Sequence, residues 1–145
     1  MNLFELAKIS KGKLIGESLD VNSFSIDTRT LKPSDTYIAL LGENFDGHDF
    51  ISDALDKGAS AVITSKPIAI KIPQIVVSDT HKFLNMVAIH NRKNFKGKLI
   101  GITGTNGKTT SKELINIVLQ KKYQTYCTKG NLNNHIGVPL SILEL

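Results

Sequence analysis

The sequence contains no tryptophan and one cysteine, Cys127, among its 145 residues. A single cysteine excludes an internal disulfide bond and gives no indication of an oxidising compartment. Because Cys127 follows Tyr126 in a short apolar stretch, we interpret it as a packing residue and not as a nucleophile. The sequence also lacks a basic leader and any run of about 18 apolar residues. We therefore expect a cytoplasmic protein without a membrane span.

Aromatic residues are scarce as well, at 6% of the chain, although the net charge is +5. Nucleic-acid-binding surfaces typically combine basic patches with aromatic side chains on which bases stack. Here the basic residues are scattered, and the densest groups are Lys121-Lys122 and the stretch 92–98. An anionic small molecule explains the charge equally well. We therefore expect no nucleic-acid partner, and keep a non-catalytic nucleotide- or nucleic-acid-binding module as an alternative.

The most informative motif is the glycine-rich stretch of residues 101–110, Gly-Ile-Thr-Gly-Thr-Asn-Gly-Lys-Thr-Thr. It lies between an apolar run and a segment whose apolar residues have helical spacing. A strand, a glycine loop, Lys-Thr and a helix in this order are typical of a P-loop, where backbone N–H groups and the helix N-terminus bind phosphate. The residues predicted to bind ATP are Gly104, Thr105, Asn106, Gly107, Lys108, Thr109 and Thr110.

Lys108 and Thr109 are the candidate catalytic residues of this loop. Lys108 would bring positive charge to the γ-phosphate, and the Thr109 hydroxyl would be a ligand of Mg²⁺. The spacing departs from the common pattern, because position 102 carries Ile102 and the glycine stands one residue earlier, at Gly101. The sequence therefore predicts a variant P-loop. The structural alternative is a Gly-Thr-Asn turn that only begins a helix.

The pattern of apolar residues predicts an α/β fold in two parts. Residues 1–78 are expected to form a small α/β domain, and residues 79–145 the first portion of a P-loop domain with a parallel sheet. The helices are expected near 3–9, 48–57, 80–94 and 108–121, with a further one near Pro139. The strands are expected near 24–26, 36–41, 61–64, 75–77, 99–103 and 125–128, the last two forming a βαβ unit with the helix between them.

A second polar group follows the last of these predicted strands, within residues 130–140. Its amide and imidazole side chains, among them Asn133, Asn134 and His135, can bond phosphate or bound water. They would lie at the carboxyl end of the predicted parallel sheet, beside the P-loop, where such sheets bind ligands. The structural alternative is an Asn-rich turn that caps the helix near Pro139.

Three groups of residues resemble the Mur ligases. Residues 103–110 are similar to the ATP loop of that family, although folylpolyglutamate synthase and cyanophycin synthetase share related loops. Residues 130–140 resemble the MurF type in particular. Residues 25–29, the turn at 33–35 and residues 42–50 are similar to the UDP-binding domain of MurE and MurF. Together these motifs span nearly the whole chain.

The resemblance implies an ATP- and Mg²⁺-dependent amide ligase of cytoplasmic peptidoglycan precursor synthesis. ATP would phosphorylate the terminal carboxylate of UDP-MurNAc-tripeptide, and the amine of D-alanyl-D-alanine would attack the acyl phosphate. By the same resemblance, the residues implied to bind the UDP-MurNAc-peptide are Ile26, Thr28, Arg29, Glu43, Asn44, Phe45, Asp46, Gly47, Asn133, Asn134 and His135.

Mur ligases have three domains and are several times longer, so we expect this chain to be an N-terminal portion that has no ligase activity alone. The family's other metal ligands have no position here, and the full-length parent is expected to be a monomer. The alternatives within the superfamily are a MurE-type or a folylpolyglutamate-synthase-like ligase. Arg29 as a salt-bridge residue and His48 as no more than a helix-start residue also stay open.

Overall fold

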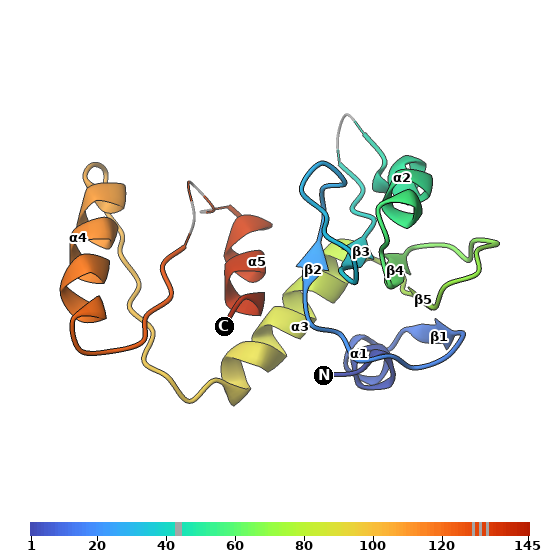
Figure 1. Ribbon diagram of the computed structural model, residues 1–145, viewed down its shortest axis with the longest axis horizontal. Coiled ribbons are helices and arrows are strands. Elements are labelled where there is room, and N and C mark those ends of the chain that lie inside the picture. Colours follow the sequence, from blue (N-terminus) through green and yellow to red (C-terminus); the bar gives the residue numbers. More distant parts are fainter. Residues whose placement is uncertain (43–44, 129, 131, 133) are drawn as a thin grey trace.

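A five-stranded sheet lies at the centre of the first part of the chain (Figure 1). The computed structural model describes residues 1–42, 45–128, 130, 132 and 134–145. The strand order is β1-β5-β4-β3-β2, with β2 to β5 parallel and β1 antiparallel to β5. The strands are β1 Lys13–Ile15, β2 Phe24–Ser25, β3 Thr36–Ile38, β4 Ala61–Thr64 and β5 Gln74–Val76. The predicted α/β class is confirmed, and the edge strand β1 was not predicted.

The helices follow the predicted order. They are α1 Leu3–Ser10, the 3-10 helix η1 Gly47–Phe50, α2 Ile51–Asp56, α3 Thr80–Asn94, α4 Lys108–Gln120 and α5 Gly137–Leu143. The predicted helix 48–57 is therefore η1 followed by α2. Asn2 and Glu5 form a capping box at α1, as their spacing predicts. Among the described residues, no helix combines the length and the apolar character needed to cross a membrane.

Successive strand residues point to opposite faces of the sheet, and both faces are covered by helices. On one face, Ile38 and Ile63 pack with α1 and with Phe83 and Leu84 of α3. On the other face, Tyr37 and Val62 pack with residues of α2. The helix α3 thus shares a core with the sheet that precedes it. The division of the chain near residue 78 stays a prediction.

The helix α5 lies beside α3 (Figure 1). Ile136 and Leu140 pack against the core cluster to which α3 contributes. Asn91 of α3 donates through its side-chain N–H to the carbonyl of Ile142, at 2.7 Å. The C-terminal segment is therefore connected to the sheet through α3.

The strands predicted at 99–103 and 125–128 are not formed, so the βαβ prediction is wrong in its strands and right in its helix. A strand needs a neighbour for its N–H and C=O groups, and parallel sheets are normally covered on both faces. Within the described ranges neither segment pairs with a strand, and α4 has no buried residue. Lys112 still connects α4 to the carbonyl of Thr128, at 2.5 Å.

Two leucine substitutions test this contrast between the parts of the chain. Leu84 in α3 is fully buried, and Leu114 in α4 is 59% exposed. Leu84→Ala is expected to lower the free energy of unfolding by about 2–5 kcal/mol, because it removes packed methyl groups and leaves a cavity. Leu114→Ala is expected to change it by about 0.5 kcal/mol or less. Urea unfolding measures both, and equal losses would contradict the core assignment.

Candidate functional site

The four parallel strands end at one edge of the sheet, and their following segments meet there. Residues 26–29 follow β2, residues 39–48 follow β3, Ser65 follows β4, and the N-terminus of α3 follows β5. Ligands of open parallel sheets bind outside the carboxyl ends of the strands. We call this region the carboxyl edge.

An ion pair occupies the segment after β2. Arg29 donates to the Asp27 carboxylate through Nη2 at 2.6 Å and Nε at 3.0 Å, and its backbone N–H donates at 2.9 Å. The side-chain hydrogen bond from Arg29, followed by the backbone one, lowers the pKa of Asp27. The salt bridge that the sequence left open for Arg29 is formed. Because the Arg29 side chain is 86% exposed, its guanidinium still faces solvent.

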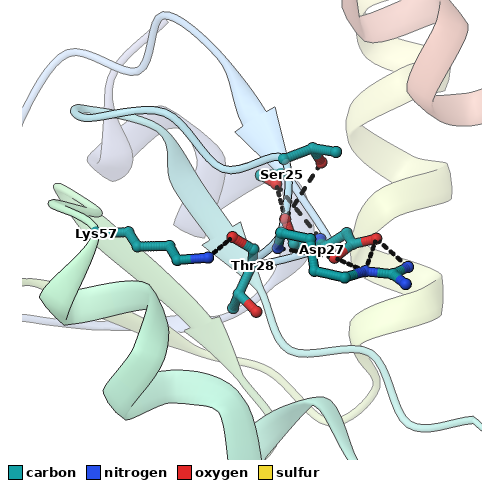
Figure 2. Close-up of polar contacts among 6 residues, drawn as sticks. Ser25, Asp27, Thr28 and Lys57 are labelled. Atoms are coloured by element: carbon teal, nitrogen blue, oxygen red, sulfur yellow. Dashed lines mark hydrogen bonds and ion pairs between the residues drawn. The ribbon is translucent and has the colours of Figure 1, made fainter.

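Thr28 is joined to α2 by Lys57, the residue at the C-terminal cap of that helix. The Lys57 ammonium donates to the carbonyl oxygen of Thr28 at 2.7 Å (Figure 2). The hydroxyl of Ser25 donates to the carbonyl of Asp27 at 3.0 Å and supports the same segment from within β2. Thr28 is only 7% exposed and Ile26 packs against the core, so both residues offer little surface to a ligand.

The segment after β3 is held by its own backbone and by Tyr37. The Gly47 N–H donates to the carbonyl of Leu40 at 2.8 Å, and the Tyr37 hydroxyl donates to the carbonyl of Gly47 at 3.0 Å. A Cβ on Gly47 would lie 2.6 Å from the Leu40 oxygen, so only glycine fits. Burial, with Asp27 and Asp46 nearby, raises the pKa of Tyr37 to about 12.

Asp46 and His48 join this segment to the end of β4. Asp46 accepts hydrogen bonds from the backbone N–H of His48 at 2.9 Å and from its Nδ1 at 2.5 Å. These two bonds, the backbone one first, lower the pKa of Asp46. On the other side of the ring, the Ser65 N–H donates to Nε2 at 2.9 Å. Phe45 is exposed, whereas the predicted residues Glu43 and Asn44 lie outside the described residues.

His81, at the start of α3, lies close both to the segment after β3 and to His135 of the Asn-rich segment 130–140. Its Nε2 lies 2.8 Å from the carbonyl oxygen of Leu41, and its ring lies 6.1 Å from the ring of His135. Asn134 accepts from the N–H groups of Ile136 and Gly137, at 3.1 and 2.7 Å. Its side chain thus serves the start of α5, as the structural alternative expected. Asn133 lies outside the described residues.

The backbone of the glycine loop turns at two glycines before α4 begins. Gly104 and Gly107 have φ values of 154° and 75°, which favour glycine, and Gly107 directly precedes α4. The Lys108 ammonium donates to the carbonyls of Gly104 and Thr105, so it lies against the loop that it would share with a phosphate. Thr105, Asn106, Thr109 and Thr110 are exposed.

The glycine loop forms no hydrogen bond or ion pair with Asn134 or His135, two described residues of the Asn-rich segment 130–140. For Mg²⁺, Thr109 offers one exposed hydroxyl oxygen, and the described part of the chain has no group of three metal-binding His, Cys, Asp or Glu.

Several residues of the carboxyl edge were not predicted as site residues. Lys57, Ser65 and His81 reach it from segments far along the chain, which no local pattern reveals. Asp27 could have been predicted, because an Asp two residues before an Arg is a sequence pattern that allows an ion pair, and the structure contains that pair.

Two ranges of the chain match models of known protein families. Residues 20–94 match the family model described as Mur ligase family, catalytic domain, and residues 102–145 match the Mur ligase middle domain. A relative from Buchnera aphidicola subsp. Acyrthosiphon pisum, a UDP-N-acetylmuramoyl-tripeptide--D-alanyl-D-alanine ligase, is 42% identical over 145 residues, covering 100% of this chain and 32% of the relative.

Solved structures give the same likeness. A crystal structure of MurF from Acinetobacter baumannii has a TM-score of 0.85 and 33% identity, over 98% of this chain and 32% of that one. MurF ligase from Thermotoga maritima in complex with ADP has a TM-score of 0.71 and 36% identity, over 85% of this chain and 29% of that one. The chain spans about a third of the length of the relatives it matches.

The ion pair between Asp27 and Arg29 predicts how the stability of the protein depends on pH. Because the pKa of Asp27 is lowered in the folded state, its contribution to stability is present above the unfolded-state pKa and is lost as the pH falls through the folded-state pKa. Arg29→Ala is expected to raise the pKa of Asp27 while leaving the backbone hydrogen bond. NMR titration of the carboxyl carbons measures this.

Lys82→Ala is the matched control, because Lys82 pairs with a different carboxylate, Asp79. It is expected to leave the Asp27 titration unchanged. An unchanged Asp27 titration in Arg29→Ala would show that the ion pair does not form in solution.

Proposed function

Because the chain belongs to the Mur ligase family, we propose that it is the UDP- and phosphate-binding part of a MurF-type ligase, which joins D-alanyl-D-alanine to UDP-MurNAc-tripeptide with ATP. The observation that carries the proposal is the glycine loop, whose Gly107 leads into α4 with Lys108 and Thr109 at its start. The likeness to MurF extends from this loop back through the carboxyl edge. The process would be cytoplasmic peptidoglycan synthesis.

The chemistry explains why such a loop is needed. A carboxylate is a poor electrophile, and it becomes reactive when one oxygen carries the γ-phosphoryl group of ATP. The amine of the dipeptide then displaces phosphate and forms the amide. In this scheme the Lys108 ammonium leaves the carbonyls of Gly104 and Thr105 and binds the γ-phosphate. The N–H groups at the start of α4 bind the other phosphates of ATP. Thr109 would hold Mg²⁺, which supplies further positive charge to the phosphates.

The carboxyl edge suits the uridine diphosphate end of the substrate. Asp27 takes up Nε and one N–H of Nη2 of Arg29, and the remaining N–H groups of the exposed guanidinium are free to donate to a diphosphate. Phe45 offers an exposed aromatic ring from the segment after β3, and the buried Gly47 supports that segment through its bonds to Leu40 and Tyr37. Glu43 and Asn44 are further predicted contacts, and the predicted residues Ile26 and Thr28 would support the segment from the core. Asn133, Asn134 and His135 are proposed to approach the γ-phosphate and the incoming carboxylate.

A MurE-type ligase is the second candidate, since a UDP-N-acetylmuramoyl-L-alanyl-D-glutamate--2,6-diaminopimelate ligase from Lactiplantibacillus plantarum is 36% identical over 119 residues. The relatives named as tripeptide ligases reach higher identity and cover the whole chain, which favours the MurF type. A nucleic-acid-binding module has only the net charge in its favour.

Calorimetric titration of the chain with UDP-MurNAc-tripeptide tests the substrate assignment. Saturable binding is expected, and Arg29→Ala is expected to weaken it about tenfold or more, because a charge-assisted hydrogen bond to phosphate is lost. Lys71→Ala, which removes an exposed positive charge just before β5, is the control and should bind normally. Salt-sensitive binding of an oligonucleotide with no binding of the UDP-sugar would instead favour the nucleic-acid alternative.

The glycine loop is tested separately with ATP and Mg²⁺. Lys108→Ala is expected to lower the affinity for ATP about tenfold or more, because a full positive charge beside the phosphates is removed. Lys121→Ala, at the opposite end of α4, removes an equal charge and should have little effect. Equal ATP affinity in all three proteins would contradict the P-loop assignment.

A further inference from the structure

His48 is nearly inaccessible, with 4% of its side chain exposed, and it joins two segments that follow different strands. Nδ1 contacts Asp46 at 2.5 Å, and Nε2 accepts from the Ser65 N–H at 2.9 Å. A helix-start residue needs neither contact. The arrangement therefore calls for a role beyond beginning η1.

The contacts determine which ring nitrogen carries the proton. A backbone N–H can only donate, so Nε2 of His48 must offer its lone pair to Ser65. The proton of the neutral ring then lies on Nδ1 and is donated to the Asp46 carboxylate, whose lowered pKa keeps it ionised.

The order Asp46, His48, Ser65 resembles that of a Ser-His-Asp hydrolase, since the Ser65 hydroxyl oxygen also lies 3.0 Å from Nε2. A nucleophilic serine needs the Nε2 lone pair to take its proton. Here the Ser65 N–H already occupies that lone pair. The geometry consequently favours a structural link over a nucleophile.

The link adjoins a turn whose two ends are paired with each other. The Gly42 N–H donates to the carbonyl of Phe45 at 2.9 Å, and Leu41 and Asp46 form an isolated bridge across the same turn. Asp46 is thus both the end of the turn and the partner of His48. Holding binding residues in place before the ligand arrives reduces the entropy lost on binding.

We propose that His48 is a positioning residue for a nucleoside diphosphate: through Asp46 and Ser65 it fixes residues 45–48, after β3, to the end of β4. This inference rests on the proposed function, in which this segment holds the uridine diphosphate end of the substrate. His48 itself does not contact the ligand.

Calorimetric titration of the 145-residue chain with UDP tests the proposal. An asparagine amide replaces Nδ1 and a glutamine amide oxygen replaces Nε2, so His48→Asn keeps the bond to Asp46 and His48→Gln keeps the bond to Ser65. His48→Asn is expected to weaken UDP binding about tenfold, because the link to β4 is one hydrogen bond to a buried ring. His48→Gln keeps the link to β4 and the backbone bond from residue 48 to Asp46, so it is expected to retain most of the affinity.

Two controls accompany these variants. Ser65→Ala keeps the backbone N–H and is expected to bind UDP within about twofold of the parent chain. His90→Ala removes a histidine from α3, outside the carboxyl edge, and should bind normally. NMR of the ring nitrogens should show His48 protonated on Nδ1 and not on Nε2.

The outcomes separate the two claims. Parent-like UDP affinity in His48→Asn, or a proton on Nε2 of His48, overturns the positioning role and leaves the proposed function standing. A parent chain that does not bind UDP overturns the proposed role of residues 45–48 and this inference together.

Discussion

The structure depends on how the backbone polar groups at the carboxyl edge are paired. Four parallel strands end there, and each following segment leaves N–H and C=O groups that a sheet no longer satisfies. Side chains from other segments take up this role: Tyr37 donates to Gly47, Lys57 to Thr28, and His48 accepts from Ser65. These bonds connect neighbouring loops, so the segments around the proposed binding surface are joined to one another without a bound ligand.

The helices of the second part of the chain differ in how much of their surface is buried. The helix α4 buries none of its residues, whereas α5 packs on α3 and through it on the sheet. The glycine loop therefore keeps its local geometry, set by Gly104 and Gly107, without a surrounding core. Its chemistry is local, and its orientation toward the carboxyl edge depends on the exposed segments that flank α4.

Local chemistry explains what the sequence could predict. The capping box at Asn2, the glycine loop and the helix α3 follow from patterns within a few residues, and each is present. The strands at 99–103 and 125–128 were predicted wrongly, because apolar character does not supply a pairing partner. Ser65 and His81 reach the edge only through the tertiary fold, so no spacing in the sequence indicates them.

The central claim is that the carboxyl edge is a prepared site for a uridine diphosphate group. Amide NMR spectra of the chain titrated with UDP test it most directly. The account predicts saturable shifts concentrated at residues 25–29, 45–48 and 65, with little change in α1 or along the exposed face of α4. Shifts confined to the glycine loop, or spread evenly over the basic residues, would contradict it.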